Sequence, residues 1–218
     1  MPQTAKADRN AAGKLSSNDP AQGILDVAEQ LAQTLGYNGF SYADIAERLG
    51  VTKASLHYHF ASKADLGSAL IARYQVVFAQ ALEAIEQQER DPAERLQRYV
   101  ALYDAVMSDD RMCLCGMLAA EYATLPRPMQ AQLKLFFDAN ERWLTAVLEA
   151  GSRAGRFGFK EAPKERAQVL LGALEGAMLV ARSYGDPQRF RSTARHVLED
   201  LGKVEVTQQR KAKAGSTG

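Results

Sequence analysis

The 218-residue sequence lacks the features that mark membrane, secreted and metal-binding proteins. It has no apolar run near the roughly 20 residues that a membrane span needs, and residues 1–19 are too polar for a signal peptide. Its two cysteines, Cys113 and Cys115, are too few for a disulfide framework and have no companion ligands for zinc. We therefore expect a cytoplasmic protein that binds no metal, no cofactor and no membrane.

An excess of positive charge is also missing. The chain has 27 basic and 26 acidic residues, so its formal net charge is only +1. Nucleic-acid binding would then depend on basic side chains gathered at one place, because the surface as a whole is not basic. Hydrophobic residues make up 46% of the chain, which is typical of an ordinary globular protein.

What the sequence does have is a helical spacing of apolar residues almost throughout. The predicted helices lie within residues 20–35, 41–49, 52–58, 62–85, 92–107, 113–123, 129–148, 164–184 and 187–202. No segment shows the alternation of a strand. We predict an all-α protein of about nine helices, three of them short and followed by a larger helical body. The polar ends, residues 1–18 and 203–218, are predicted to be disordered tails.

The segment that follows residue 40 has the residue types that a helix-turn-helix requires. Ala46 is small where two helices would cross closely, and Gly50 supplies the backbone freedom for the turn between them. Polar side chains would face outward from the second helix. The apolar residues expected to hold that helix at its angle are Ile45, Leu49, Val51 and Leu56.

The stretch from Ile45 to Leu66 reads IAERLGVTKASLHYHFASKADL and resembles the signature of the TetR/AcrR family of transcriptional regulators. The resemblance covers roughly residues 20–66. It implies a helix-turn-helix DNA-binding domain over 19–66 and a helical ligand-binding and dimerisation domain over 67–202. One residue departs from the pattern, because His57 stands where the family usually has tyrosine.

Several polar residues are candidates for contact with DNA. The resemblance implies phosphate contacts for Tyr58, His59 and Lys63. Lys53, Ser55 and His57 lie in the second helix, where side chains meet base edges in the major groove. With the polar residues that begin the two helices, the expected set is Ser41, Thr52, Lys53, Ser55, His57, Tyr58, His59 and Lys63.

Small residues in the helix over 164–184 would let another helix approach closely. They would serve either packing within one chain or contact between two chains. The resemblance implies that the last two helices pair with their symmetry mates in a four-helix bundle of a homodimer. The expected interface residues are Gly172, Ala173, Gly176, Ala177, Phe190, Ala194 and Val197.

The helices of the body carry aromatic and sulfur-containing side chains. Such stripes are ordinarily core, but rings with polar tips and methionines also suit an adaptable cavity. The resemblance implies a cavity for a small-molecule effector in this part of the chain. Its expected lining is Tyr99, Tyr103, Met107, Cys113, Met117, Glu121, Tyr122, Phe136 and Trp143.

The two cysteines allow a second interpretation of the same body. The segment Met112–Glu121 is partly similar to a Gly-Cys-Leu-x-Gly-Asn-Leu-x-x-Glu pattern found in some TetR-type regulators, including some that respond to electrophiles. Cys113 is expected near a helix N-terminus with Arg111 close by, and both would lower the pKa of a sensor thiol. The alternative is that both cysteines are small buried hydrophobes.

These patterns favour a repressor that a small molecule releases from a palindromic operator in double-stranded DNA. In a dimer, two recognition helices would lie about one DNA turn apart, roughly 34–36 Å. A thiol-responsive regulator is the nearest alternative. A helical enzyme is disfavoured because Cys113, the one plausible nucleophile, has no histidine near it in sequence. An architectural DNA-binding protein without a ligand is disfavoured by the large apolar body.

Overall fold

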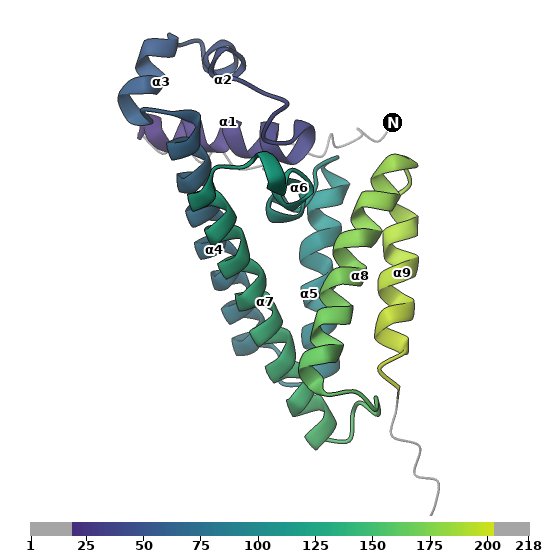
Figure 1. Ribbon diagram of the computed structural model, residues 1–218. Coiled ribbons are helices and arrows are strands. Elements are labelled where there is room, and N and C mark those ends of the chain that lie inside the picture. The colour runs from purple at the N-terminus through teal and green to yellow at the C-terminus, as the bar shows by residue number, and fades with distance from the viewer. Residues whose placement is uncertain (1–18, 203–218) are drawn as a thin grey trace, which may run out of the picture.

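The computed structural model describes residues 19–202, and every regular element among them is helical (Figure 1). The tails predicted over 1–18 and 203–218 lie outside the described residues. The elements are α1 (Pro20–Leu35), α2 (Tyr42–Leu49), α3 (Lys53–His59), α4 (Lys63–Gln88), α5 (Pro92–Ser108), α6 (Leu114–Ala120), the 3-10 turn η1 (Tyr122–Thr124), α7 (Arg127–Arg153), α8 (Pro163–Ser183) and α9 (Pro187–Glu199). The prediction of an all-α chain with nine helices is confirmed for these residues.

The first four helices begin at side chains that accept hydrogen bonds from free backbone amides. Asp19 accepts from the amide of Ala21 at 2.9 Å, and Thr52 accepts from the amide of Ser55 at 3.2 Å. Ser41 and Ser62 each form a reciprocal capping box with an aspartate three residues later. These caps explain why α1 to α4 start where the sequence predicts.

Helices α1 to α3 form a head at one end of the molecule, and α4 leaves it to run the length of the body (Figure 1). The predicted domain boundary at residue 66 falls inside α4, which continues unbroken to Gln88. Arg73 on α4 pairs with Asp26 and Glu29 on α1, each at 2.6 Å. Head and body therefore share one helix.

The body is a bundle in which α7 packs against α4 and α8, and α9 packs against α8 and α5. The short α6 lies between the head and these long helices (Figure 1). The predicted helix over 113–123 is interrupted at Glu121, and η1 follows it. In the described part of the chain, no helix is both long and apolar enough to cross a membrane.

One acidic side chain points into this core from α8. The two carboxyl oxygens of Glu175 are buried and have no hydrogen-bond partner among the described residues. One of them, Oε2, lies against Gly116 on α6. A Cβ atom at Gly116 would lie only 2.2 Å from this oxygen, so the glycine leaves the space that the carboxyl group fills. Burial raises the pKa of Glu175 to about 7, and the nearby Cys113 thiol offsets only part of this rise.

We predict that Glu175→Gln stabilises the protein above neutral pH. Because the pKa is raised on folding, the folded chain holds the Glu175 proton more tightly, and stability falls as pH rises from about 4.5 through 7. The amide variant escapes this loss, so its free energy of unfolding should exceed that of the wild type at pH 8 by up to about 3 kcal/mol. Urea unfolding at pH 5 and pH 8 measures the difference, with the exposed Glu165→Gln as control. An equal difference at both pH values would contradict the prediction.

Candidate nucleic-acid interface and effector region

The angle of α3 is set by buried side chains and one left-handed turn residue. Ile45 and Leu56 are fully buried between α2 and α3, and Ala46 is buried at their crossing. Gly50 ends α2 with φ 67° and ψ 31°, a conformation that favours glycine. The predicted roles of these residues are confirmed. Val51 is an exception, because its side chain is 43% exposed and does not lock α3.

Helix α3 presents a polar and aromatic face to solvent. Thr52, Lys53, His57 and Tyr58 are exposed, whereas Ser55 and His59 are partly buried. Tyr58 is 87% exposed, an unusual state for a large aromatic side chain. The Tyr58 and His59 rings meet edge-on, with their centroids 5.2 Å apart. This face has the shape and chemistry of a recognition helix.

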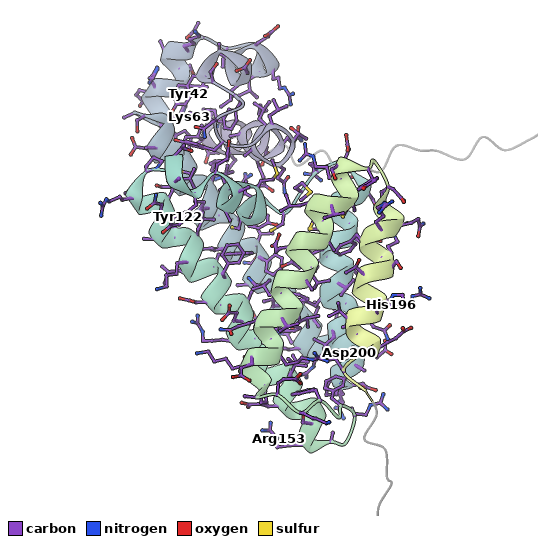
Figure 2. The ribbon with its side chains drawn as sticks, turned by 45° about the vertical axis from the view of Figure 1, so that its right-hand side comes forward. Tyr42, Lys63, Tyr122, Arg153, His196 and Asp200 are labelled. Carbon is purple, nitrogen blue, oxygen red and sulfur yellow. The ribbon has the colours of Figure 1, made fainter. Side chains whose placement is uncertain are left out.

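Four of the predicted DNA contacts come together beside α3. A shallow hollow of about 350 Å³ lies among the start of α2, α3 and the start of α4. Figure 2 shows two of its lining residues, Tyr42 and Lys63, in the head. The side chain of Ser41 is already used as the cap of α2, and its hydrogen bonds lower the pKa of Asp44. The lining residues are Phe40, Ser41, Tyr42, Ala43, Lys53, His57 and Lys63.

The His57 ring is oriented by its neighbours. Its Nδ1 lies 3.1 Å from the carbonyl oxygen of Ala61, and its ring centroid lies 4.7 Å from that of Tyr42. The Tyr42 hydroxyl donates to the carbonyl oxygen of Phe60 at 2.9 Å. Because a carbonyl only accepts, Nδ1 carries the proton in the neutral ring and Nε2 is an acceptor. The exposed His57 ring therefore presents an acceptor at Nε2, unlike a tyrosine hydroxyl, which also donates.

Lys63 has a structural role that the sequence did not indicate. Its ammonium donates to the carbonyl oxygens of Tyr37 and Phe40 and lies 4.5 and 4.3 Å from the centroids of their rings. Burial lowers the pKa of Lys63, and the charges of Glu121 and Asp44 partly offset this effect. Two of the three ammonium hydrogens are thus engaged by the α1–α2 loop. A contact between Lys63 and a DNA phosphate stays a prediction, and it would use the third ammonium hydrogen.

Glu121 also binds the α1–α2 loop, which corrects its expected place in an effector cavity. Its carboxylate accepts from the backbone amides of Tyr37 and of Asn38, the latter at 3.2 Å. Gly36, with φ 81°, makes room for this carboxylate, because a Cβ there would lie 2.9 Å from Oε1. Glu121 occupies the C-cap of α6. It therefore joins the body to the head.

The end of α1 supplies the second half of this joint. The carbonyl oxygen of Gln33 accepts from the backbone amide of Met112 and from Arg182 of α8, both at 3.2 Å. Arg111 donates to the side-chain oxygen of Gln33 at 3.2 Å. Sequence reasoning missed Gln33 and Arg182, because neither belongs to a motif and their contact spans 149 positions.

Most of the expected effector residues do gather in the body, but as a packed cluster. The Tyr99 hydroxyl donates to Asn140 at 3.0 Å and lies 2.9 Å from the Tyr103 hydroxyl. Trp143 stacks on Tyr99 with centroids 5.4 Å apart. Tyr99, Tyr103, Met107, Cys113 and Phe136 are all buried. Met117 lies apart, with its sulfur 3.5 Å from Arg182, and Tyr122 is 52% exposed near the start of α7 (Figure 2).

The thiols are not the reactive groups that the sequence suggested. Cys113 and Cys115 are 1% and 0% exposed. Burial, and next the charge of Glu175, raise the pKa of both thiols well above their usual value. Arg111 pairs with Asp109 and Gln33 rather than with a thiol. The expectation of an accessible, low-pKa Cys113 is therefore wrong, and both cysteines pack as small core residues.

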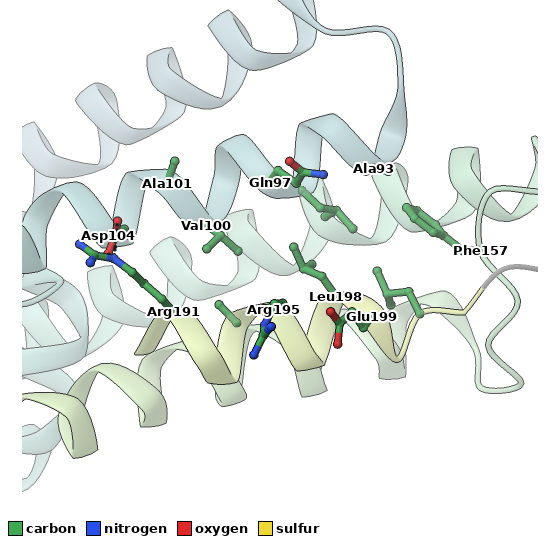
Figure 3. Close-up of a pocket in the computed structure, with 13 residues that line it drawn as sticks. Ala93, Gln97, Val100, Ala101, Asp104, Phe157, Arg191, Arg195, Leu198 and Glu199 are labelled. Carbon is green, nitrogen blue, oxygen red and sulfur yellow. Dashed lines mark hydrogen bonds and ion pairs between the residues drawn. The ribbon is translucent and has the colours of Figure 1, made fainter. Parts of the chain in front are cut away.

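The surface of the body also has a groove that the sequence did not predict. It has a volume of about 550 Å³, lies between α5 and α9, and is floored by apolar residues that include Val100 and Leu198 (Figure 3). Arg191 pairs with Asp104 at 2.8 Å at one end. In the described part of the chain, no three His, Cys, Asp or Glu residues cluster so as to hold a metal ion.

The expected interface residues divide into two groups. Gly172 and Gly176 are exposed on α8, and a Cβ at either would meet no atom within 4 Å. Ala173, Ala177 and Val197 are partly buried. Phe190 and Ala194 are 0% and 2% exposed within one chain, so they are unavailable to a partner and that expectation is corrected. The exposed apolar residues of α8 are Val169, Leu179 and Val180, with Tyr184 just after it.

We predict that Glu121→Gln loosens the α1–α2 loop. The variant keeps the size of the side chain but loses the charge that strengthens two hydrogen bonds from amides. Hydrogen exchange at the amides of Tyr37 and Asn38 should become at least about tenfold faster, equivalent to about 1.4 kcal/mol. The exposed Glu86→Gln on α4 serves as control. Unchanged exchange at both amides would show that the charge of Glu121 does not hold the loop.

Comparison with known proteins agrees with this architecture. Residues 24–70 match bacterial regulatory proteins of the tetR family, and residues 92–197 match the tetracyclin repressor-like C-terminal domain. A TetR-family transcriptional regulator from Agrobacterium tumefaciens is 35% identical, with a TM-score of 0.80 over 83% of this chain and 96% of its own. A TetR regulator from Legionella pneumophila is 34% identical, with a TM-score of 0.77 over 84% and 98%.

Among curated proteins, the transcriptional regulator AcuR of Cereibacter sphaeroides is 27% identical over 73% of this chain and 75% of its own length. The matches cover the head and the body alike, and the solved relatives share about a third of their residues with this chain over most of its length. The protein belongs to the TetR family of DNA-binding transcriptional regulators.

Proposed function

We propose that the protein is a homodimeric repressor that binds a palindromic operator and is released by a small-molecule effector. The observation that carries this proposal is the hollow beside α3, where Ser41, Lys53 and His57 share one exposed face. Lys53 lies at the first residue of α3, where a cation can meet a phosphate or a guanine edge. Contacts with DNA phosphates would set the position of the protein along the DNA, and contacts with base edges would supply the sequence preference.

Dimerisation through α8 would supply the second recognition helix. The exposed side chains of Val169, Leu179 and Val180 form an apolar face along this helix, and Gly172 and Gly176 lie between them. Small residues at such a face allow another helix to approach closely. A two-fold axis there would relate the two heads, so that each α3 enters one half-site of the operator.

Release by an effector is supported by the joint between head and body. The α1–α2 loop is bound by Glu121, and the end of α1 is bound by Arg182 and by the segment that precedes α6. An effector that binds a different arrangement of α6 more tightly would move the head. A coupling of about 1–3 kcal/mol changes operator affinity 5- to 150-fold.

We predict that Lys53→Ala and His57→Ala each alter the base preference at one position of each half-site, by about 1–3 kcal/mol. The operator would first be obtained by selecting bound fragments of genomic DNA, and affinities for its single-base variants would be measured by fluorescence anisotropy. Lys164→Ala removes the same charge at the far end of the body and should change nothing. An unaltered preference in the His57 variant would mean that His57 reads no base.

The repressor role has its own test in the same system. A reporter gene placed behind the selected operator should be expressed less when the protein is present. Higher expression in its presence would identify an activator instead.

We predict that Gly176→Leu weakens the dimer and leaves the protomer folded. The new side chain has free space in the protomer but would overpack a helix that approaches α8 from a second chain. Sedimentation at micromolar concentration should show a dimer for the wild type and a larger monomer fraction for the variant. Gly23→Leu, at a helical glycine of the head with similar space, is the matched control. A monomeric wild type would refute dimerisation through α8.

A further inference from the structure

The least satisfied polar group in the core of the body is the carboxyl group of Glu175. Its two oxygens are enclosed and accept no hydrogen bond from an N–H or O–H group of the described residues, and the one donor close to them is the weakly donating thiol of Cys113. The hydroxyls of Tyr99 and Tyr103 on α5 are satisfied, because they bond to each other and Tyr99 donates to Asn140 on α7. Buried charges in proteins are ordinarily paired, since an unpaired carboxylate is costly to remove from water. Glu175 therefore has an unfilled requirement for a donor or a cation.

No basic side chain in residues 19–202 forms an ion pair with this carboxylate. The two arginines on α8 that lie near the core are engaged elsewhere. Arg166 pairs with Asp200 at 2.5 Å, and Arg182 donates to the carbonyl oxygens of Gln33 and Thr34. A positive partner for Glu175 would therefore have to come from outside the described residues.

The surroundings of Glu175 suit an organic cation. Burial, with a smaller contribution from the charge of Glu175, raises the pKa values of Tyr74, Tyr99 and Tyr103, so Glu175 lies on the side of the body where these rings pack. They belong to a continuous cluster in which neighbouring ring centroids lie 5.3–6.2 Å apart. A carboxylate beside aromatic faces is the combination that recognises ammonium groups. The rings of the cluster are Tyr74, Phe78, Tyr99, Tyr103, Phe136 and Trp143.

A second unsatisfied group lies in the same cluster. The indole nitrogen of Trp143 is buried and has no acceptor among the described residues, although its ring stacks on Tyr99. Glu175 and Trp143 thus leave one free acceptor and one free donor within the packed body, and a ligand would have to part the rings to reach them.

We propose that Glu175 anchors the protonated nitrogen of an arylalkyl ammonium ligand, and that this organic cation is the effector of the repressor. The inference rests on the proposed function, because it names the chemical class that the effector region takes. Glu175 also fills the space at Gly116, so a ligand that draws the carboxylate away would loosen the contact between α8 and α6. Helix α6 ends at Glu121, which binds the head.

The chain supplies its own reporter for a binding experiment. Trp143 is the only tryptophan in the sequence and lies in the aromatic cluster, so its fluorescence can follow binding without a label. The probes are phenylmethylammonium, 2-phenylethylammonium and 4-phenylbutylammonium ions, with 3-phenylpropanoate as the anion of similar shape. At least one cation should give a saturable change in fluorescence, and the anion should give none.

Glu175→Gln should weaken binding of that cation at least tenfold, whereas Glu165→Gln, at the exposed start of α8, should leave it unchanged. Circular dichroism and urea unfolding without probe verify that both variants are folded. Equal affinity in the Glu175 variant and the wild type, tighter binding of the anion, or no saturable response to any of the three cations would overturn the proposal.

The pH dependence gives a second, independent readout. The probe stays protonated between pH 6 and pH 8, whereas Glu175 loses its proton in this range, so affinity should rise with pH. The facing groups Cys113 and Cys115 at α6, Tyr74 on α4, and Tyr99 and Tyr103 on α5 keep their protons because burial raises their pKa values. The Glu175→Gln variant should show a flat profile, and a slope equal to that of the wild type would contradict the assignment.

Operator binding is measured separately, with labelled DNA and no probe, so the two proposals can fail independently. A protein that binds the cation through Glu175 but binds no DNA would refute the repressor function and leave the site intact. A cation that binds through Glu175 without lowering operator affinity would overturn its role as the effector.

Discussion

The backbone between α1 and α2 satisfies only part of its own polar groups, and the arrangement of the molecule depends on how other elements satisfy the rest. The carbonyl oxygens of Tyr37 and Phe40 accept from Lys63, at the start of α4. The amides of Tyr37 and Asn38 donate to Glu121, at the end of α6. Buried backbone groups without partners are costly, so this short loop holds three elements at one place. The direction in which the head leaves the body follows from these contacts.

These contacts also explain why a movement of α6 in the body would affect the head. One end of the helix holds the loop through Glu121, and its middle packs Gly116 against the carboxyl group of Glu175. A hydrogen bond to a charged group contributes about 1.5–3 kcal/mol, which is similar to a typical coupling energy between two sites. A small displacement of α6 that weakens one such bond would thus change how firmly the head is held. The packed core transmits such a displacement because it has little free space.

Some parts of the site could be predicted because they depend on residues close together in sequence. The capping boxes at Ser41 and Ser62 span three positions each, and Gly50 separates two helices that contact each other. Other parts could not. Lys63 resembles a phosphate contact in its motif, yet it is bound to a loop 23 to 26 positions away. Cys113 has a basic neighbour in sequence, but Arg111 points to Gln33 instead.

The sequence by itself determined the nine helices of residues 19–202, the side-chain caps that begin α1 to α4, the helix-turn-helix and the family, because local hydrogen bonding and the 3.6-residue period act over short distances. Only the tertiary structure decided which polar side chains face one another. Glu175 and Glu121 are both acidic residues within helical segments, and no local pattern separates them. One is enclosed without a partner and the other binds two amides. That difference arises from the packing of α6 against α8 on one side and against the head on the other, because burial and pairing are properties of the assembled core.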